Sequence, residues 1–297
     1  MIRRFVLAGI LALASVAQAQ LRVIATTTDL KSLTEALGGA DIAASHLIPP
    51  TVNAEDYQPK PQDLARVRAA DLIIRVGVDY DLWLDRLLAQ APDALRRGGS
   101  RHVDASSAIA LVDVRSASLG AGDGHAHGSG NPHYWLDPNN AAIITGTLLE
   151  ALARIDPGHA KAFERRRIEF LDSLERKRPE WEARLAPLQG KAIVAYHNTW
   201  AYFARRYRLR IVGFVEVREG VAPTPAHLAG LIKTMREQQV TILIRQPHES
   251  SRDVDFLALR TNARIAILAA SIGAAPQATD YVSLIEHNVQ TLARASR

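Results

Sequence analysis

The sequence predicts an α/β protein with two (β/α) lobes, each built on a parallel sheet, joined by a long rigid helix. Short apolar strands alternate with helical segments in the first and last parts of the 297-residue chain, and this alternation is typical of parallel sheets covered by helices. Between them, a helical pattern restarts at Asp156-Pro157 and continues to about Leu185. A helix of ~28 residues is about 42 Å long, which exceeds the need of one lobe and suits a strut between two.

The first lobe begins with a β-branched strand at Leu21–Thr26, followed by a helix that Thr28 or Asp29 can cap and that ends near Gly38 and Gly39. Further strands are expected at His46–Ile48, Leu72–Val76 and Ile109–Val114, and further helices at Gln62–Ala69, with Pro61 at its first position, and at Leu82–Gln90. From Ala117 to Pro132 the composition changes to Gly, Ser, Ala and His without a hydrophobic period, which indicates a surface loop.

The middle of the chain is helical, over Asn139–Ile155 and then along the long helix, in which Pro179 is expected to introduce a kink. The long helix carries one apolar stripe at spacings of 7, 4, 7 and 4, formed by Phe163, Phe170, Leu174, Trp181 and Leu185. The second lobe repeats the rhythm with strands at Ala192–Tyr196, Ile211–Val215, Thr241–Ile244 and Arg264–Leu268, and helices near Trp200–Tyr207, Pro225–Glu237, Val254–Thr261 and Tyr281–Ala293.

The first residues predict export. Arg3 and Arg4 precede an apolar run from Phe5 to Val16, and Ala17-Gln18-Ala19 supplies the small-x-small pattern read by signal peptidase. The run is shorter than the ~20 residues that span a bilayer, so we expect a cleaved signal peptide and a periplasmic protein. The expected organisation is a signal peptide at 1–19, an N-terminal lobe at 20–138, a helical segment with the strut at 139–186, and a C-terminal lobe at 187–297.

Composition limits the partners and the ligand chemistry. The chain has no cysteine, which excludes disulfides and thiolate metal sites, so a transition metal needs His, Asp or Glu ligands. The formal net charge of +5 falls to +3 when Arg3 and Arg4 are removed. Because this excess is spread along the chain without a basic block, nucleic acid is not an expected partner.

Three groups of candidate ligands lie in loops. In open parallel sheets, ligands bind beyond the carboxyl ends of the strands. Glu55 and Asp56 follow the second expected strand, His197 directly follows the strand that ends at Tyr196, and His133 lies in a loop before the central helices. A single histidine is usually structural, but two at loop sites in different lobes with a carboxylate at a third favour a shared site.

The motifs around these residues are specific to one family. Asn131–Pro138 reads Asn-Pro-His-Tyr-Trp-Leu-Asp-Pro, and Tyr196–Trp200 and Gly213–Thr224 complete the pattern. The chain resembles, over essentially its whole mature length, the zinc- and manganese-type solute-binding proteins of ABC importers. This resemblance implies two (β/α) lobes joined by a long helix with the metal between them, a monomer, and a membrane permease as partner.

The resemblance implies ligands one position at a time. His133 matches the second family ligand and His197 the third, both inside intact motifs. The first ligand is normally a histidine, and Glu55 stands in its place. The fourth, usually an aspartate heading a turn, has no match, because residues 269–271 read Ala-Ala-Ser.

His248, in Gln-Pro-His-Glu after the strand that ends at Ile244, is the candidate for the missing ligand, with a plain loop histidine as the alternative. Asp280 and Glu216 are weaker candidates, because we interpret Asp280 as a helix cap and Glu216 as a residue of the cleft rim. His125 and His127 lie in the loop before the central helices, where they either collect metal or have no role.

Together these features predict a protein that binds one ion and catalyses nothing. Two imidazoles and a carboxylate suit Zn²⁺, which is the expected transported ligand, with Mn²⁺ or Fe²⁺ as the alternative because Glu55 makes the site harder. A periplasmic zinc hydrolase is a rival interpretation, although no His-Glu-x-x-His helix or Gly-x-Ser-x-Gly elbow is present. A third possibility is a binder of metal chelates or other small solutes.

Overall fold

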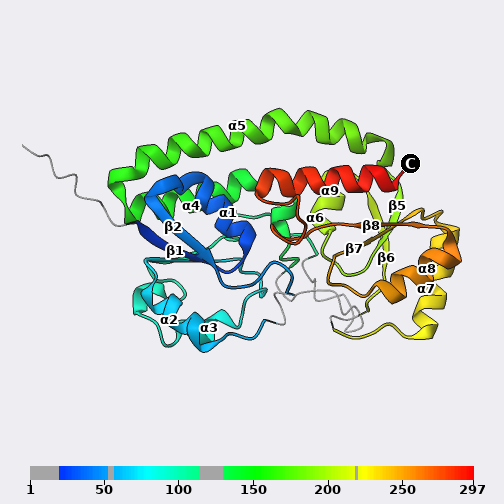
Figure 1. Ribbon diagram of the computed structural model, residues 1–297, viewed down its shortest axis with the longest axis horizontal. Coiled ribbons are helices and arrows are strands. Elements are labelled where there is room, and N and C mark those ends of the chain that lie inside the picture. Colours follow the sequence, from blue (N-terminus) through cyan, green and yellow to red (C-terminus); the bar gives the residue numbers. More distant parts are fainter. Residues whose placement is uncertain (1–19, 53–56, 114–129, 218–219) are drawn as a thin grey trace, which may run out of the picture.

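The computed structural model describes residues 20–52, 57–113, 130–217 and 220–297. In this part of the chain, two α/β lobes lie side by side and a long helix passes over both of them (Figure 1). The predicted signal peptide and the predicted sites Glu55, His125 and His127 lie outside the described residues. No helix in the described ranges is both long and apolar enough to cross a bilayer.

The N-terminal lobe contains a parallel four-stranded sheet in the order β2-β1-β3-β4. Its strands are β1 (Leu21–Ala25), β2 (Ile42–His46), β3 (Leu72–Arg75) and β4 (His102–Asp104). Its helices are α1 (Thr28–Gly38), α2 (Pro61–Ala69) and α3 (Leu84–Leu88). Thr27 caps α1, since its side chain accepts a hydrogen bond from the Leu30 amide.

The C-terminal lobe has a second parallel sheet in the equivalent order, β6-β5-β7-β8. Its strands are β5 (Ala192–Ala195), β6 (Arg210–Phe214), β7 (Ile242–Arg245) and β8 (Arg264–Ile267). Its helices are α6 (Ala201–Arg206), α7 (Pro225–Glu237), α8 (Ser251–Thr261) and α9 (Tyr281–Ala295). In each lobe, the first strand of the sheet lies between the second and the third strands. The chain therefore changes direction across the sheet between the first and third strands, and parallel sheets bind ligands at such a switch point.

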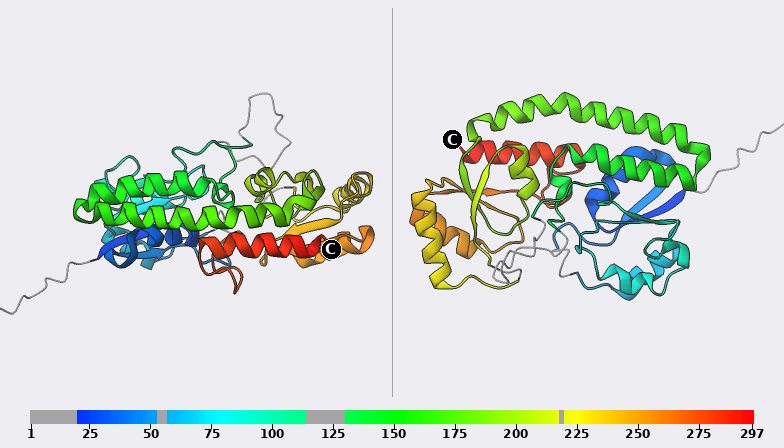
Figure 2. Two further views of the ribbon diagram at one scale, coloured as in Figure 1. Left: turned by 90° about the horizontal axis from the view of Figure 1, so that it is seen from above. Right: turned by 180° about the vertical axis from the view of Figure 1, so that it is seen from behind.

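The strut predicted from the sequence is confirmed. After α4 (Asn140–Ile155), helix α5 (Ala160–Leu185) runs across both lobes, with α4 beneath one half and α9 beneath the other (Figures 1 and 2). Of its apolar stripe, Phe163, Leu174, Trp181 and Leu185 are buried and Phe170 is partly buried. The helix continues through Pro179 without a break.

A continuous apolar core joins the lobes. It includes residues of both sheets together with α4, α5 and α9, whereas a second cluster is confined to the C-terminal lobe, against α7 and α8. Trp135, in the single turn Tyr134–Leu136, is fully buried in the shared core. Its indole Nε1 donates to the Ala270 carbonyl at 2.8 Å, and its own carbonyl accepts from the Tyr281 hydroxyl at 2.5 Å.

Two strand predictions in the first lobe were wrong. Strand β2 lies at Ile42–His46, four residues before the predicted start, because its alanines carry little β-branched signal. Leu47 and Ile48 extend the ladder, since their amides donate to the ends of β1. No strand occurs in the described part of the stretch predicted at Ile109–Val114. The strand at the edge of the sheet next to β3 is β4. It is only three residues long and has no apolar run that would identify it.

Asp29 forms a buried link between the lobes. Its Oδ1 accepts a hydrogen bond from the Ile272 amide at 3.0 Å, across 243 positions of sequence. Its Oδ2 is buried without a hydrogen-bond partner among the described residues. Burial raises the pKa of Asp29 from 3.8 to about 7, against the opposing effects of the Ile272 amide and the Ser271 side chain.

We predict that Asp29→Asn stabilises the protein in a pH-dependent way. A carboxyl whose folded-state pKa is raised contributes stability below about pH 4, and this contribution is lost as the pH rises to about 7. Asparagine does not titrate, so the stability of the variant relative to wild type should rise between pH 5 and pH 8, by at most about 3 kcal/mol.

Urea unfolding at the two pH values measures this difference. Asp93→Asn is a suitable control, because the Asp93 side chain is 90% exposed. An equal stability difference between Asp29→Asn and wild type at pH 5 and pH 8 would contradict the buried, protonated carboxyl.

Candidate metal centre

His197 lies at the carboxyl end of β5 beside a buried carboxylate. The parallel ladder between β5 and β6 continues past both strands, since the Glu216 amide donates to the Tyr196 carbonyl at 2.9 Å. This register brings Glu216 next to His197, and the His197 Nδ1 lies 3.0 Å from Glu216 Oε2. The other oxygen, Oε1, accepts from the Gly220 amide at 2.7 Å. Glu216 is buried, so its interpretation as a rim residue was wrong.

His133 is held by its own loop. It is buried just before the turn Tyr134–Leu136, and Asn131 Oδ1 accepts from its backbone amide at 3.0 Å. The same oxygen lies 3.2 Å from His133 Nδ1. Because a backbone N–H can only donate, the amide oxygen of Asn131 must face His133.

These partners determine the tautomers of both rings. A neutral imidazole has one N–H and one lone pair, and both Asn131 Oδ1 and a carboxylate oxygen of Glu216 are acceptors. In the neutral form of each ring, Nδ1 therefore carries the hydrogen and Nε2 the lone pair. This is the arrangement found in metal-binding histidines, where the second ring nitrogen donates to a carbonyl or carboxylate.

The two rings are close enough to share an ion. Their centroids are 6.3 Å apart and their planes differ by 70°. Two imidazoles on a tetrahedral zinc ion, with Zn–N of ~2.0–2.1 Å, have centroids about 5 Å apart. The observed separation exceeds this value by roughly 1 Å, so the spacing of the two rings is compatible with a two-histidine metal centre.

Two aromatic rings line His133. Tyr80 lies edge-on to it at 5.3 Å and Trp135 at 5.4 Å, measured between ring centroids. Both aromatic side chains are buried, and excluding water strengthens the attraction between an ion and its ligands. Trp135 belongs to the motif recognised in the sequence, whereas Tyr80 was missed because no motif surrounds it.

The loop that carries Tyr80 is locally constrained. Residues 77–79 have positive φ angles of 77°, 51° and 61°, and this conformation is strained for the β-branched Val78. A buried ion pair holds the loop, since Arg75 Nε lies 2.9 Å from Asp81 Oδ1. Asp81 also accepts from the amides of Val76 and Gly77. These contacts of Asp81 thus offset the backbone strain of residues 77–79 close to His133.

The loop after β7 brings His248 toward the same region. Gln246 Nε2 donates to Thr199 Oγ1 at 3.1 Å, which ties this loop to the one after β5. Desolvation lowers the pKa of His248, and the nearby His197 lowers it further, with Glu216 opposing. Burial also raises the pKa of Glu249 to about 7. A neutral imidazole beside His197 is available as a ligand at neutral pH.

The turn where the family's fourth ligand is expected is occupied by structural contacts. The backbone of Ala269 exchanges two hydrogen bonds with the Asn288 side chain, at 2.8 and 2.7 Å. Trp135 and Asp29 hold the next residues of the turn, as described above. Asp280 caps α9, since its carboxylate accepts from the Ser283 amide at 2.8 Å, which confirms that interpretation.

The described residues do not assemble the full predicted ligand set. Among them, no group of three or more His, Asp or Glu side chains converges to hold a metal ion. The structure brings His133 and His197 together, with His248 nearby, while Glu55 lies outside the described ranges. The ligand roles of Glu55, His133, His197 and His248 are therefore proposals.

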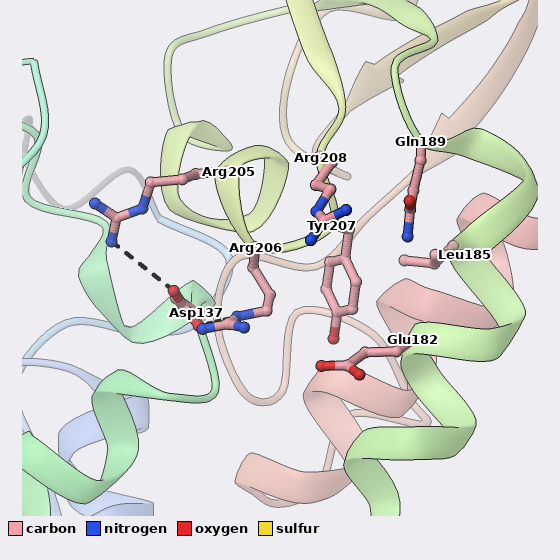
Figure 3. A pocket seen from close by; sticks show the side chains of 8 residues that line it. All are labelled: Asp137, Glu182, Leu185, Gln189, Arg205, Arg206, Tyr207 and Arg208. Atoms are coloured by element: carbon pink, nitrogen blue, oxygen red, sulfur yellow. Dashed lines mark hydrogen bonds and ion pairs between the residues drawn. The ribbon is translucent and has the colours of Figure 1, made fainter.

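A separate pocket of about 430 Å³ explains another part of the motif (Figure 3). It is lined by Asp137, Glu182, Leu185, Gln189, Arg205, Arg206, Tyr207 and Arg208. Asp137 pairs with Arg206 at 2.9 Å and with Arg205 at 3.8 Å, and it accepts from the Asn139 amide at the start of α4. Asp137, in the second half of the motif Asn131–Pro138, thus joins α4 to α6. No histidine is among the residues that line this pocket.

Comparison with known proteins gives consistent matches along the chain. The family model described as "Zinc-uptake complex component A periplasmic" matches residues 23–295. The iron-binding protein YfeA of Yersinia pestis is 22% identical over 92% of this chain and 85% of its own length. The manganese-transporter substrate-binding lipoprotein PsaA of Streptococcus mitis is 22% identical over 92% and 88%. A crystal structure of ZnuA superposes with a TM-score of 0.79 and 25% identity, covering 94% of this chain and all of that one.

We predict that Glu216→Ala weakens zinc binding by about 10–100-fold, since loss of a hydrogen-bonded partner of a ligating histidine typically has this effect. Glu216→Gln should have a smaller effect, because the amide oxygen can still accept from His197 Nδ1. Competition titration with a chelating dye measures both. Glu237→Gln, an exposed glutamate of α7, is the control. Wild-type affinity in Glu216→Ala would mean that Glu216 does not support the site.

Proposed function

The chain belongs to the periplasmic zinc-uptake component A family, and on this premise we propose that it captures one divalent transition-metal ion between its lobes and delivers it to the permease of an ABC importer. The observation that carries this proposal is the His133–His197 pair, whose rings are 6.3 Å apart and whose Nδ1 atoms each lie beside an acceptor oxygen. The ion is cargo, so binding must be reversible.

We propose zinc as the physiological ion. Two neutral imidazoles favour zinc over manganese and iron in the order of divalent affinities, and the family model describes a zinc-uptake component. Relatives named for iron and manganese make these ions the alternative. Because His133 and His197 belong to the proposed site whether zinc, iron or manganese is bound, the remaining ligands decide which ion is preferred.

The remaining ligands are proposed to be Glu55 and His248. Glu55 stands where the family has its first histidine, and His248 follows β7 on the far side of the switch point from His197. The turn at residues 269–272 offers no carboxylate, and its backbone is held by Asn288, Trp135 and Asp29. A ligand from the loop after β7 compensates for this loss.

Export and cleavage complete the proposal. We infer that residues 1–19 are removed as a signal peptide, that the mature chain acts in the periplasm as a monomer, and that it catalyses no reaction. The basic n-region, the apolar run and the Ala-x-Ala site support the first two points. The division into lobes at 20–138 and 187–297, with the helical segment between them, follows the same sequence signals.

We predict that the mature protein binds close to one zinc ion per chain, and that His133→Ala and His197→Ala each weaken binding by more than the roughly 10–100-fold caused by losing an outer partner. Calorimetry and elemental analysis measure the affinity and the stoichiometry. His159→Ala removes an imidazole at the start of α5, where it pairs with Asp156, and should bind normally. Unchanged zinc affinity in His133→Ala or in His197→Ala would contradict the assignment of that histidine as a ligand.

We predict that Glu55→Gln lowers affinity, because it removes a negative charge with little change of shape. Glu55→His should retain binding and shift selectivity from manganese toward zinc, since imidazole is the softer ligand. His248→Ala should weaken zinc binding if His248 completes the site. Competition between the two metals in each variant measures these effects. Wild-type affinity in His248→Ala would assign the fourth position to water.

A further inference from the structure

Asn131 contacts the loops of both histidines. Its Oδ1 accepts from the His133 amide and lies 3.2 Å from His133 Nδ1. Its Nδ2 donates to the Asn198 carbonyl at 2.7 Å, directly after His197. A single side chain thus connects two segments that are 67 positions apart in sequence.

Further hydrogen bonds fix Asn131 itself. The Tyr202 hydroxyl donates to the Asn131 carbonyl at 3.0 Å and accepts from the Val112 amide at 3.2 Å. Asp113 Oδ2 accepts from Asn198 Nδ2 at 3.1 Å and, more weakly, from Asn131 Nδ2 at 3.4 Å. Asn131 is only 1% exposed, so its side-chain amide is satisfied by these protein groups.

We propose that Asn131 is a positioning residue that fixes the tautomer of His133 and holds its loop against the loop of His197 before the metal arrives. This inference rests on the proposed metal-binding function, but it concerns a residue outside the ligand set. Both actions come from the two ends of one amide: the oxygen accepts from Nδ1, and the nitrogen bridges to the second loop.

The physical argument is one of preorganisation. Without the Asn131 amide, three polar groups lose a partner: the His133 amide, the His133 Nδ1 and the Asn198 carbonyl. The His133 ring can then rotate or carry its hydrogen on Nε2, where it blocks coordination. Binding must reorder the ring and the two loops, and this lowers affinity because ordering side chains and loops opposes association.

Two substitutions separate the two actions. Asn131→Ala removes both, whereas Asn131→Asp keeps an acceptor for Nδ1 and loses the donor to Asn198. Long-range proton–nitrogen NMR of the metal-free protein identifies the tautomer of each ring, with His133→Ala and His197→Ala spectra providing the assignments. Asn140→Ala is the matched control, because the Asn140 side chain is also buried and donates to the Tyr134 carbonyl at 2.8 Å, whereas Asn131 contacts His133 itself.

We expect wild type and Asn131→Asp to show His133 with its hydrogen on Nδ1, and Asn131→Ala to show a mixture. The His197 ring signals should shift in both variants, since both lose the bond to Asn198. Zinc affinity should fall by about 10–100-fold in Asn131→Ala and stay near wild type in Asn140→Ala.

Unchanged His133 tautomer and affinity in Asn131→Ala would overturn the proposal, and an equal loss in Asn140→Ala would reduce Asn131 to a general structural role. Unshifted His197 signals in both Asn131 variants would overturn the link between loops. If wild type itself binds no zinc, the proposed function fails instead, and the tautomer spectra still test the positioning role.

Discussion

Trp135 lies where the two lobes, the C-terminal helix and a cleft histidine meet. Its indole donates to Ala270 after β8, its carbonyl accepts from Tyr281 at the start of α9, and its ring packs against His133. The core around it contains buried residues of both sheets. The distance between the loops that carry His133 and His197 therefore depends on ordinary core packing, and only its final adjustment depends on polar contacts.

Those polar contacts differ between the two histidines. His133 faces a neutral amide at Asn131, while His197 faces the carboxylate of Glu216. An anionic acceptor makes the ring a more basic ligand than a neutral one does. If both histidines bind the ion as proposed, His197 is supported by a charged partner and His133 by a neutral one.

The sequence predicted the strut and the two parallel sheets, because a helical stripe and apolar runs are local signals. Intact motifs also singled out His133 and His197, whose rings the fold brings to 6.3 Å from one another. The sequence failed at β2 and β4, whose alanines and short length carry no such signal. It also missed Tyr80 and misplaced Glu216, since their roles arise from the register of β5 with β6 and from the constrained loop after β3. Contacts between distant segments leave no spacing to recognise in one chain.

Helix α5 has a mechanical consequence for how cargo leaves. It spans both lobes in 26 unbroken residues, and swinging the lobes apart as rigid halves would expose Trp135, Tyr281 and their neighbours to water. The described hydrogen bonds between the loops after β5 and β7, such as the one from Gln246 to Thr199, lie outside that core. Release of the ion is thus expected to depend on movement of the loops at the cleft more than on rotation of the two lobes as rigid bodies.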